Sequence, residues 1–292
     1  METAPKQNTG GRECGMQTAL AIQGGGKTYQ NMYIIVDYVK DNIEAKVRAR
    51  RCLIYDTNGE YTPEEFAKNG IPNFNARRIA VKDVRAWCRD PKTIECRRID
   101  AKALGISEKK TVLEYLASNV IDCLLVIEDV NTYVLQMSHM EAVIGKLVSL
   151  RHYGVDVLIS YQSARAAEPR IYQNSRWVRM HFIGDNVDES KSKIPNFPLY
   201  KIAQIIVTQR FEKGDIRFFV FIMGIGGRKL EGAFTKAEWE DACDKYFLIN
   251  KKEVREHALI NKSSEEESRK KLVDRYTMLY YGNKDAQTQI TK

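Results

Sequence analysis

Long apolar runs are missing from this sequence of 292 residues, which contains no stretch of about 18 apolar residues and therefore predicts no membrane-spanning helix. The first fifteen residues are polar, which predicts that no signal peptide is present and that the chain is cytoplasmic. The six cysteines include no Cys-x-x-Cys pair, and the four histidines show no ligand spacing, so nothing in the sequence indicates a disulfide framework or a zinc site. With 43% hydrophobic and 29% charged residues, the chain has the composition of an ordinary globular protein.

Positive charge exceeds negative charge, since 46 Lys and Arg residues stand against 38 Asp and Glu and give a formal net charge of +8. Such a balance favours a polyanionic partner, nucleic acid ahead of a membrane surface. Many soluble proteins are mildly basic, so charge by itself does not decide between a nucleic-acid partner and none.

A short apolar segment runs into three glycines and a Lys-Thr pair between Thr18 and Thr28. This order is typical of a strand, a phosphate-binding loop and a helix. Glycines let consecutive backbone N–H groups turn toward a polyanion, and the helix that follows directs its positive end to the same place. In such loops the lysine reaches the β- and γ-phosphates, and the hydroxyl of the next residue binds Mg²⁺. The candidate ATP-binding residues are Gln23, Gly24, Gly25, Gly26, Lys27 and Thr28.

One position departs from the usual Gly-x-x-x-x-Gly-Lys-[Ser/Thr] pattern, because Ala21 stands where the first glycine is expected. The alternative interpretation is a flexible glycine-rich loop followed by a chance Lys-Thr pair. The rest of the chain argues against this alternative, since it supplies the acidic and amide residues that nucleotide hydrolysis requires.

Apolar strand-like segments alternate with segments of helical periodicity, which predicts βαβ units and a mostly parallel sheet flanked by helices. The strongest strand candidates are 52–56, 120–129 and 155–162, where apolar residues are nearly continuous. Helices are expected at 28–43, 107–118, 137–153, 199–210 and 235–247.

Three regions differ in composition along the chain. Residues 1–15 form a polar leader, 16–247 an ATPase domain, and 248–292 a charged C-terminal extension. Apolar residues are sparse in the extension until 272–281, where we expect one isolated amphipathic helix.

Two acids, Glu128 and Asp129, end the most apolar strand candidate. Ligands of open α/β sheets bind beyond the carboxyl ends of the strands, so these acids are expected to face the phosphate loop. There Thr28 and Glu128 are the candidate Mg²⁺ ligands, Glu128 through a water, and Asp129 polarises the attacking water. Asp129 is one methylene shorter than the glutamate usual at this place, and both acids have helix capping as an alternative role. Gln162 ends the next strand candidate, where an amide can contact the γ-phosphate.

Four segments of this chain together resemble the FtsK–HerA superfamily of P-loop DNA motors, and they occur in the order found there. The second resembles the family's Asp-x-x-Gly-Glu-Tyr element, and the fourth its Arg-x-x-Gly region that leads into a Thr-Gln sensor. The resemblance covers residues 17–185, roughly, and rests on Gly24–Thr28, Leu53–Tyr61, Leu125–Asp129 and Arg151–Ser163.

The resemblance implies a RecA-like (ASCE) P-loop NTPase fold, ATP and Mg²⁺ as cofactors, and a homo-oligomeric ring of five or six subunits. In such rings an arginine of one subunit completes the site of its neighbour. Arg151 matches that position, while Arg165, Arg170 and Arg176 are rivals, and a plain helix-end cation is the alternative role for Arg151. DNA would pass through the ring, held by sequence-independent contacts to its phosphates.

The leading prediction is an ATP-hydrolysing DNA translocase that packages a viral genome into a capsid. Such a protein would lie in the host cytoplasm or with the virion, and would dock on a capsid or membrane-vertex protein. One alternative is a zonular-occludens-toxin-like phage-assembly ATPase that exports single-stranded DNA. Another is a nucleotide-binding assembly protein without turnover, which Ala21 and the Glu-Asp order at Glu128 and Asp129 favour.

Overall fold

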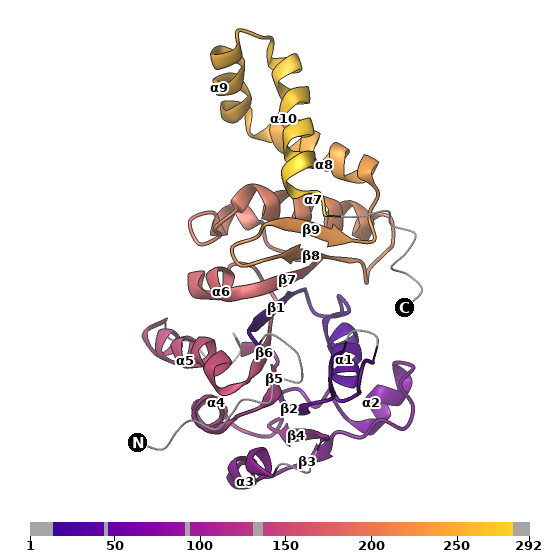
Figure 1. Ribbon diagram of the computed structural model, residues 1–292, viewed down its shortest axis with the longest axis vertical. Coiled ribbons are helices and arrows are strands. Elements are labelled where there is room, and N and C mark those ends of the chain that lie inside the picture. Colours follow the sequence, from indigo (N-terminus) through magenta and orange to yellow (C-terminus); the bar gives the residue numbers. More distant parts are fainter. Residues whose placement is uncertain (1–13, 44–45, 91–93, 131–136, 283–292) are drawn as a thin grey trace. The chain divides into compact units, whose positions relative to one another are not determined.

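The computed structural model describes residues 14–43, 46–90, 94–130 and 137–282 (Figure 1). These residues form two compact units. Unit 1 contains the described residues up to Ala19 and those of Lys27–Gln162, and unit 2 contains Leu20–Gly26 and the described residues from Ser163 onward. Most of the predicted leader lies outside the described residues, and the three predicted domain ranges stay predictions.

Unit 1 is built on parallel strands. They lie in the order β3-β4-β2-β5-β6-β1, and each pair of neighbours from β3 to β6 is parallel. The predicted mostly parallel sheet is thereby confirmed, with β6 between the strand that precedes the glycines and the strand that precedes the acid pair. The bounds are β1 Met16–Leu20, β2 Arg51–Asp56, β3 Arg77–Arg78, β4 Cys96–Asp100, β5 Cys123–Ile127 and β6 Asp156–Tyr161.

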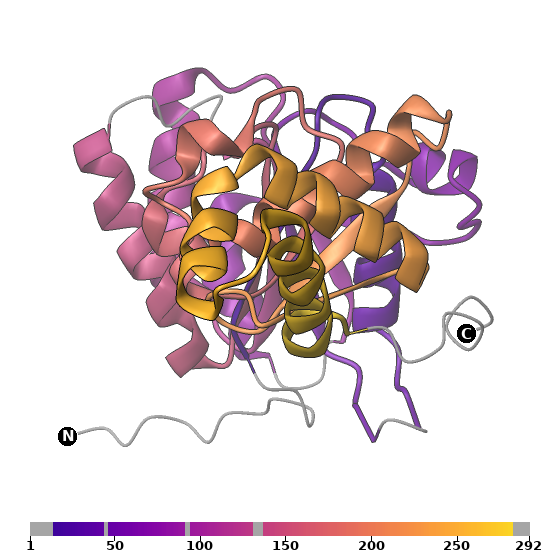
Figure 2. The same ribbon diagram turned by 90° about the horizontal axis from the view of Figure 1, so that it is seen from above.

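The central strands of unit 1 are covered on both faces, which explains their continuous apolar sequence. Every residue of β5 and β6 is buried. Helices α1 and α2 lie on one side of these strands, and α4 and α5 lie on the other (Figures 1 and 2). The helices of unit 1 are α1 Lys27–Tyr38, α2 Pro63–Lys68, α3 Val84–Arg89, α4 Ile106–Asn119 and α5 Met137–Ser149, with 3₁₀ turns η1 Val81–Asp83 and η3 Leu150–Tyr153.

The register of the central strands brings their carboxyl ends to one level. Tyr55 of β2 is paired with Ile127 of β5, and Ile127 is paired with Ile159 of β6. The residues that follow these three positions are therefore neighbours at one edge of the sheet, although they are far apart in sequence. This is the edge at which the sequence predicts the acids to lie.

Helix α1 is shorter than predicted, ending at Tyr38 instead of Ile43. The Tyr38 carbonyl accepts a hydrogen bond from the Arg50 N–H at 2.9 Å, so the incoming chain takes the place of the next helical turn. The Tyr38 hydroxyl donates to the buried Asp156 carboxylate. The strand predicted at 120–129 likewise begins only at Cys123, because Val120 caps α4 and Asp122 has a positive φ of 48°.

Unit 2 contains an antiparallel hairpin and its neighbour. Strands β7 (Ser175–His181), β8 (Phe219–Met223) and β9 (Lys229–Gly232) pair antiparallel in that order. The Thr235 hydroxyl accepts from the Glu238 N–H at 3.2 Å, and the Thr235 N–H donates to Glu238 Oε2 at 2.8 Å, so α8 begins with a capping box. The helices are α6 Pro169–Asn174, α7 Phe197–Glu212, α8 Lys236–Ile249, α9 Lys251–Asn261 and α10 Glu265–Tyr280, with the 3₁₀ turn η4 Val187–Ser190.

The prediction of one isolated helix in the C-terminal extension was wrong. Two helices are present, and α9 and α10 lie side by side (Figures 1 and 2). The Tyr276 hydroxyl of α10 donates to Glu253 Oε1 of α9 at 2.9 Å, and Trp239 Nε1 of α8 donates to Thr277 Oγ1 at 2.9 Å. Periodicity alone missed this packing because charged residues dominate both helices. No helix in the described part of the chain has the length and apolarity needed to cross a membrane.

Truncating an α10 side chain tests whether this helix belongs to the fold. Leu272 is 2% exposed, so Leu272→Ala is expected to lower the free energy of unfolding by about 2–4 kcal/mol through lost burial and a cavity. Met278, on the same helix, is 85% exposed, and Met278→Ala is expected to change it by less than about 0.5 kcal/mol. Urea unfolding of the full chain measures both, and equal small effects would contradict the packed arrangement.

Candidate nucleotide site

The glycine-rich segment forms a turn between β1 and α1, as the sequence predicts. Gly24 and Gly26 have φ values of 76° and 85°, a backbone conformation that residues with side chains rarely adopt. The Gly25 N–H donates to the Ile22 carbonyl at 3.2 Å. Helix α1 begins at Lys27, directly after the last glycine. Lys27 and Thr28 thus occupy the first turn of a helix, where its dipole favours an anion.

Ala21 fits its position without strain. Its side chain is fully buried, and it is not among the described residues with a positive φ. The backbone at this position therefore does not require glycine, and the departure from the usual loop pattern is compatible with the loop geometry.

Lys27 lies against the acid pair at the end of β5. Its ammonium forms an ion pair with Asp129 Oδ1 and lies 3.7 Å from Glu128 Oε2. All three side chains are buried, with exposed fractions of 7% for Lys27, 1% for Glu128 and 6% for Asp129. The strand register thus brings together three residues that the sequence separates widely.

Asp129 is held by two further donors. Asn58 Nδ2 and Gln162 Nε2 donate to its Oδ2 at 2.8 and 3.0 Å. Burial raises the pKa of the Asp129 carboxyl, but the charge of Lys27 and the hydrogen bonds from Lys27, Asn58 and Gln162 outweigh burial and hold that pKa below its usual value. Asp129 is therefore a carboxylate with its acceptor positions occupied by a cation and two amides.

Glu128 is fixed from its other side. Asn31 Nδ2 of α1 donates to Glu128 Oε1 at 2.7 Å and to Ser160 Oγ at 3.1 Å, and the Tyr61 hydroxyl also donates to Glu128 Oε1. Burial, followed by the negative charge of Glu128, raises the pKa of Tyr61 well above its usual value, so this phenol stays a donor. One Glu128 oxygen is held by these donors, and the other is directed to Lys27.

The turn after β2 supplies residues to both acids. Asp56 is fully buried and accepts from the backbone N–H groups that follow it, at 2.7 Å from Gly59, 3.0 Å from Glu60 and 3.1 Å from Tyr61. A guanidinium nitrogen of Arg98 lies 3.0 Å from Asp56 Oδ2 and balances the charge of this carboxylate. Asp56 is thus a turn-forming residue that fixes the direction of Glu60 and Tyr61.

Glu60 contacts the loop itself. The Thr28 hydroxyl donates to Glu60 Oε2 at 2.7 Å. Burial raises the pKa of Glu60, and the charges of Glu128 and Asp129 add to this effect, while the Thr28 hydrogen bond and Lys27 oppose it. Three carboxylates therefore share this edge of unit 1 with one lysine.

The donor set fits a hard cation such as Mg²⁺. Among the described residues no three His, Cys, Asp and Glu side chains form a cage for a metal ion. Mg²⁺ does not need one, because it keeps several waters and commonly binds through one or two protein oxygens and substrate phosphates. A hydroxyl and an excess of carboxylates around one lysine supply that chemistry.

The order of strands, the glycine turn and the acid pair decide the fold class. The chain has the RecA-like P-loop NTPase fold. No protein-family model matches the sequence, and no curated protein matches it.

Solved structures similar to this chain include a viral packaging NTPase and a toxin domain. The genome packaging NTPase B204 of Sulfolobus turreted icosahedral virus 2, in complex with AMP, is 14% identical over 76% of this chain and 97% of that chain, with a TM-score of 0.44. The same protein with sulfate is 13% identical over 75% and 96%, with a TM-score of 0.45. The N-terminal domain of zonular occludens toxin from Neisseria meningitidis is 12% identical over 58% and 77%, with a TM-score of 0.31.

Arg151 does not lie with the acids of its own P-loop site. It is exposed in η3, before β6 begins, whereas Gln162 follows the carboxyl end of that strand. The Asp122 N–H donates to the Tyr153 carbonyl at 3.0 Å, so this turn lies at the amino end of β5 as well. Among its rivals, Arg165 is exposed and forms a 3.7 Å ion pair with Glu189, Arg170 is exposed in α6, and Arg176 is partly exposed in β7.

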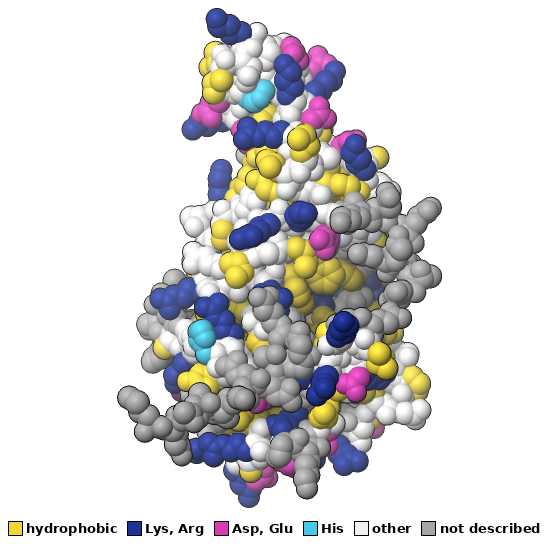
Figure 3. Space-filling model, in the orientation of Figure 1, with side chains coloured by type: hydrophobic (Ala, Val, Ile, Leu, Met, Phe, Trp, Pro, Cys, Tyr) yellow, Lys and Arg dark blue, Asp and Glu magenta, His cyan; other side chains and the backbone are white. Residues whose placement is uncertain are grey.

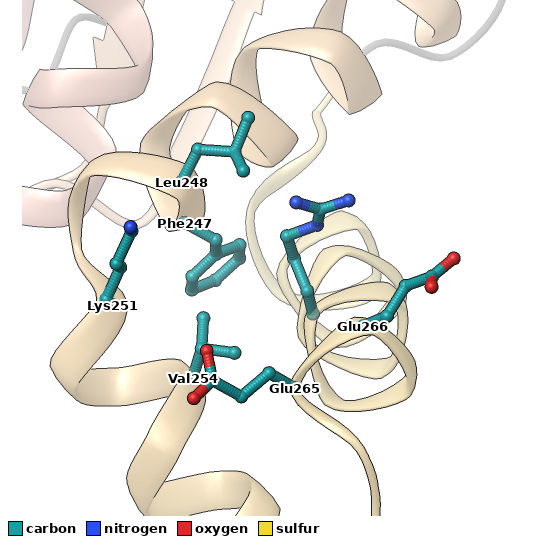
Figure 4. A pocket seen from close by; sticks show the side chains of 7 residues that line it. Phe247, Leu248, Lys251, Val254, Glu265 and Glu266 are labelled. Carbon is teal, nitrogen blue, oxygen red and sulfur yellow. The ribbon is translucent and has the colours of Figure 1, made fainter.

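A second feature of the structure is a cavity of about 270 Å³ among the C-terminal helices. Phe247, Leu248 and Val254 form its apolar part, and charged side chains surround them (Figure 4). None of the candidate nucleotide-binding residues lines this cavity.

Four residues of the site, Asn31, Asn58, Glu60 and Tyr61, are not among the predicted site residues. The Asp-x-x-Gly-Glu-Tyr resemblance points to the turn that contains Asn58, Glu60 and Tyr61. Asn31 gave only a weak signal, a polar residue one helical turn after Lys27 on a face that is otherwise apolar.

Removing the Tyr61 hydroxyl tests the support of Glu128. Tyr61→Phe deletes a hydrogen bond to a buried carboxylate and is expected to lower the free energy of unfolding by about 1.5–3 kcal/mol. The matched control is Tyr55→Phe, whose hydroxyl donates to the Lys109 carbonyl at 2.8 Å, with an expected loss of about 0.5–1.5 kcal/mol. Chemical denaturation measures both, and a Tyr61→Phe loss no larger than that of the control would refute a charged acceptor.

Proposed function

We propose that this protein is a Mg²⁺-dependent ATPase that moves DNA, and that it packages a viral genome. The observation that supports hydrolysis is the junction of Lys27 with Glu128 and Asp129, and of Asp129 with Gln162. Phosphoryl transfer to water requires a phosphate-binding turn at a helix start, a lysine, an acid pair and an amide from a neighbouring strand.

The lysine has two alternative anionic partners under this proposal. Without nucleotide its charge is balanced by Asp129 and Glu128. A triphosphate brings several negative charges to the start of α1 and competes with these carboxylates for Lys27. Binding of the β- and γ-phosphates then releases one oxygen of Asp129 from its ion pair.

Asp129 and Gln162 would handle the attacking water. The released carboxylate accepts a proton from that water. The Gln162 amide, which already donates to Asp129, orients this carboxylate toward the γ-phosphate. Asn58 keeps the carboxylate in place through its 2.8 Å hydrogen bond.

Thr28 and Glu128 would hold the cation, Thr28 through its hydroxyl and Glu128 through a water. When bound, Mg²⁺ supplies Lewis-acid stabilisation of the charge that develops on the phosphate oxygens. Asn31 and Tyr61 keep Glu128 oriented through their hydrogen bonds to Oε1.

Coupling to DNA is the second part of the proposal. The net charge of +8 suits contacts to phosphates, and Lys and Arg side chains are spread over the face drawn in Figure 3. The sequence resembles ring-forming DNA motors, and a viral genome-packaging NTPase is among the structural neighbours. A ring of five or six subunits, assembled in the host cytoplasm or on the virion, would place an arginine of one subunit at the site of the next.

The first test measures ATP hydrolysis with and without DNA. Wild-type protein is expected to hydrolyse ATP only with Mg²⁺ and faster with DNA. Asp129→Asn is expected to lower kcat by about 10²–10⁴-fold while nucleotide binding persists, because a proton acceptor is lost. Lys27→Ala is expected to abolish nucleotide binding.

Two controls accompany this test. Lys68→Ala removes an exposed lysine that pairs with Glu65 at 2.5 Å and is expected to leave hydrolysis unchanged. Lys27→Ala leaves two buried acids without their cation, so unfolding is measured alongside. Nucleotide binding without turnover by the wild type would favour an assembly protein instead. Stimulation by single-stranded but not double-stranded DNA would favour filamentous export.

The arginine assignment has its own test. Arg151→Ala and Lys27→Ala subunits are each expected to be inactive, with Arg151→Ala losing about 10³-fold in kcat. Mixing the two is expected to recover part of the activity, because an intact arginine then faces an intact loop at some interfaces. No recovery at any mixing ratio would argue against Arg151 and leave Arg165, Arg170 and Arg176 to be mixed in the same way.

A further inference from the structure

The Thr28 hydroxyl makes a hydrogen bond that its expected role does not explain. A hydroxyl has one hydrogen to donate and two lone pairs to offer. Thr28 directs that hydrogen to Glu60 Oε2, 2.7 Å away, on the turn after β2. Both lone pairs of Thr28 Oγ1 therefore stay available for a cation.

We propose that Glu60 is the positioning residue that orients the Thr28 hydroxyl as a ligand of the nucleotide's divalent cation. This inference rests on the proposed ATPase function and adds a residue to it. Glu60 acts through Thr28 and needs no contact with the phosphates.

The two other carboxylates of the site are engaged elsewhere. Asp129 accepts from Lys27, Asn58 and Gln162. Glu128 accepts from Asn31 and Tyr61 on one oxygen and directs the other toward Lys27. Glu60 is thus the carboxylate of this group that meets the hydroxyl, a task distinct from that of the acid pair.

The backbone of Glu60 is held in the orientation that this contact requires. Its N–H donates to Asp56 Oδ1 at 3.0 Å, and the next N–H, of Tyr61, donates to Asp56 Oδ2 at 3.1 Å. Arg98 in turn fixes Asp56 at 3.0 Å. The carboxylate therefore reaches Thr28 from a turn whose position depends on buried groups.

A carboxylate is a better acceptor for this purpose than a neutral amide. A negative acceptor strengthens the O–H hydrogen bond and makes the hydroxyl oxygen more basic toward a metal ion. Loss of such a supporting carboxylate typically lowers metal affinity 10–100-fold. Glu60→Gln keeps the size of the side chain and removes only this charge.

The test measures cation affinity independently of hydrolysis. Binding of ADP to the full chain is titrated with Mg²⁺, and with Mn²⁺ followed by its electron paramagnetic resonance signal. Glu60→Gln is expected to raise the cation concentration at half-saturation about 10–100-fold. ADP affinity in EDTA is expected to stay at the wild-type value. The matched control is Glu65→Gln, which alters an exposed carboxylate of α2 and is expected to leave both quantities unchanged.

A double-mutant cycle separates positioning from direct ligation. In a Thr28→Val background, which lacks the hydroxyl, Glu60→Gln is expected to cause no further loss of cation affinity. A full additional loss would show that Glu60 acts without Thr28, and unchanged cation affinity in the single variant would also overturn the proposal. Glu60→Asp keeps the charge but shortens the side chain, so it is expected to lose less affinity than Glu60→Gln. Failure of the wild type to bind ADP with Mg²⁺ would instead reject the ATPase function itself.

Discussion

The structure of the candidate site depends on one buried ion pair, between Lys27 and Asp129, with Glu128 beside it. Carboxylates at the end of a covered parallel sheet lose hydration, so each needs an opposite charge or several donors to remain ionised. Lys27 supplies the charge, and Asn31, Asn58, Tyr61 and Gln162 supply the donors. The main effect of the pair is structural, because it holds the start of α1 next to the end of β5.

The turn after β2 forms a second layer around this pair. Asp56 accepts three backbone hydrogen bonds, which set where Glu60 and Tyr61 lie. The Glu60 side chain then accepts from Thr28, and the Tyr61 hydroxyl donates to Glu128. A change at Asp56 or Arg98 is therefore expected to disturb both Thr28 and Glu128.

Periodicity and motif spacing predicted the parallel sheet, the glycine turn and the meeting of Lys27, Glu128, Asp129 and Gln162. These depend on local sequence and on the general rule that strand ends of a parallel sheet share one edge. Asn31 and Tyr61 were missed because a buried polar side chain looks, in sequence, like any polar residue between apolar ones. The packing of α10 was missed because few apolar residues mark it, and the end of α1 because a distant N–H, that of Arg50, terminates it.

Charge balance also indicates how the site would be loaded. If Lys27 leaves Asp129 for a phosphate, the buried Asp129 carboxylate loses its opposite charge while Glu128 stays beside it. That arrangement is costly unless a cation arrives together with the nucleotide. Binding of triphosphate and of Mg²⁺ should therefore be strongly coupled in this protein, each raising the affinity for the other by the same factor.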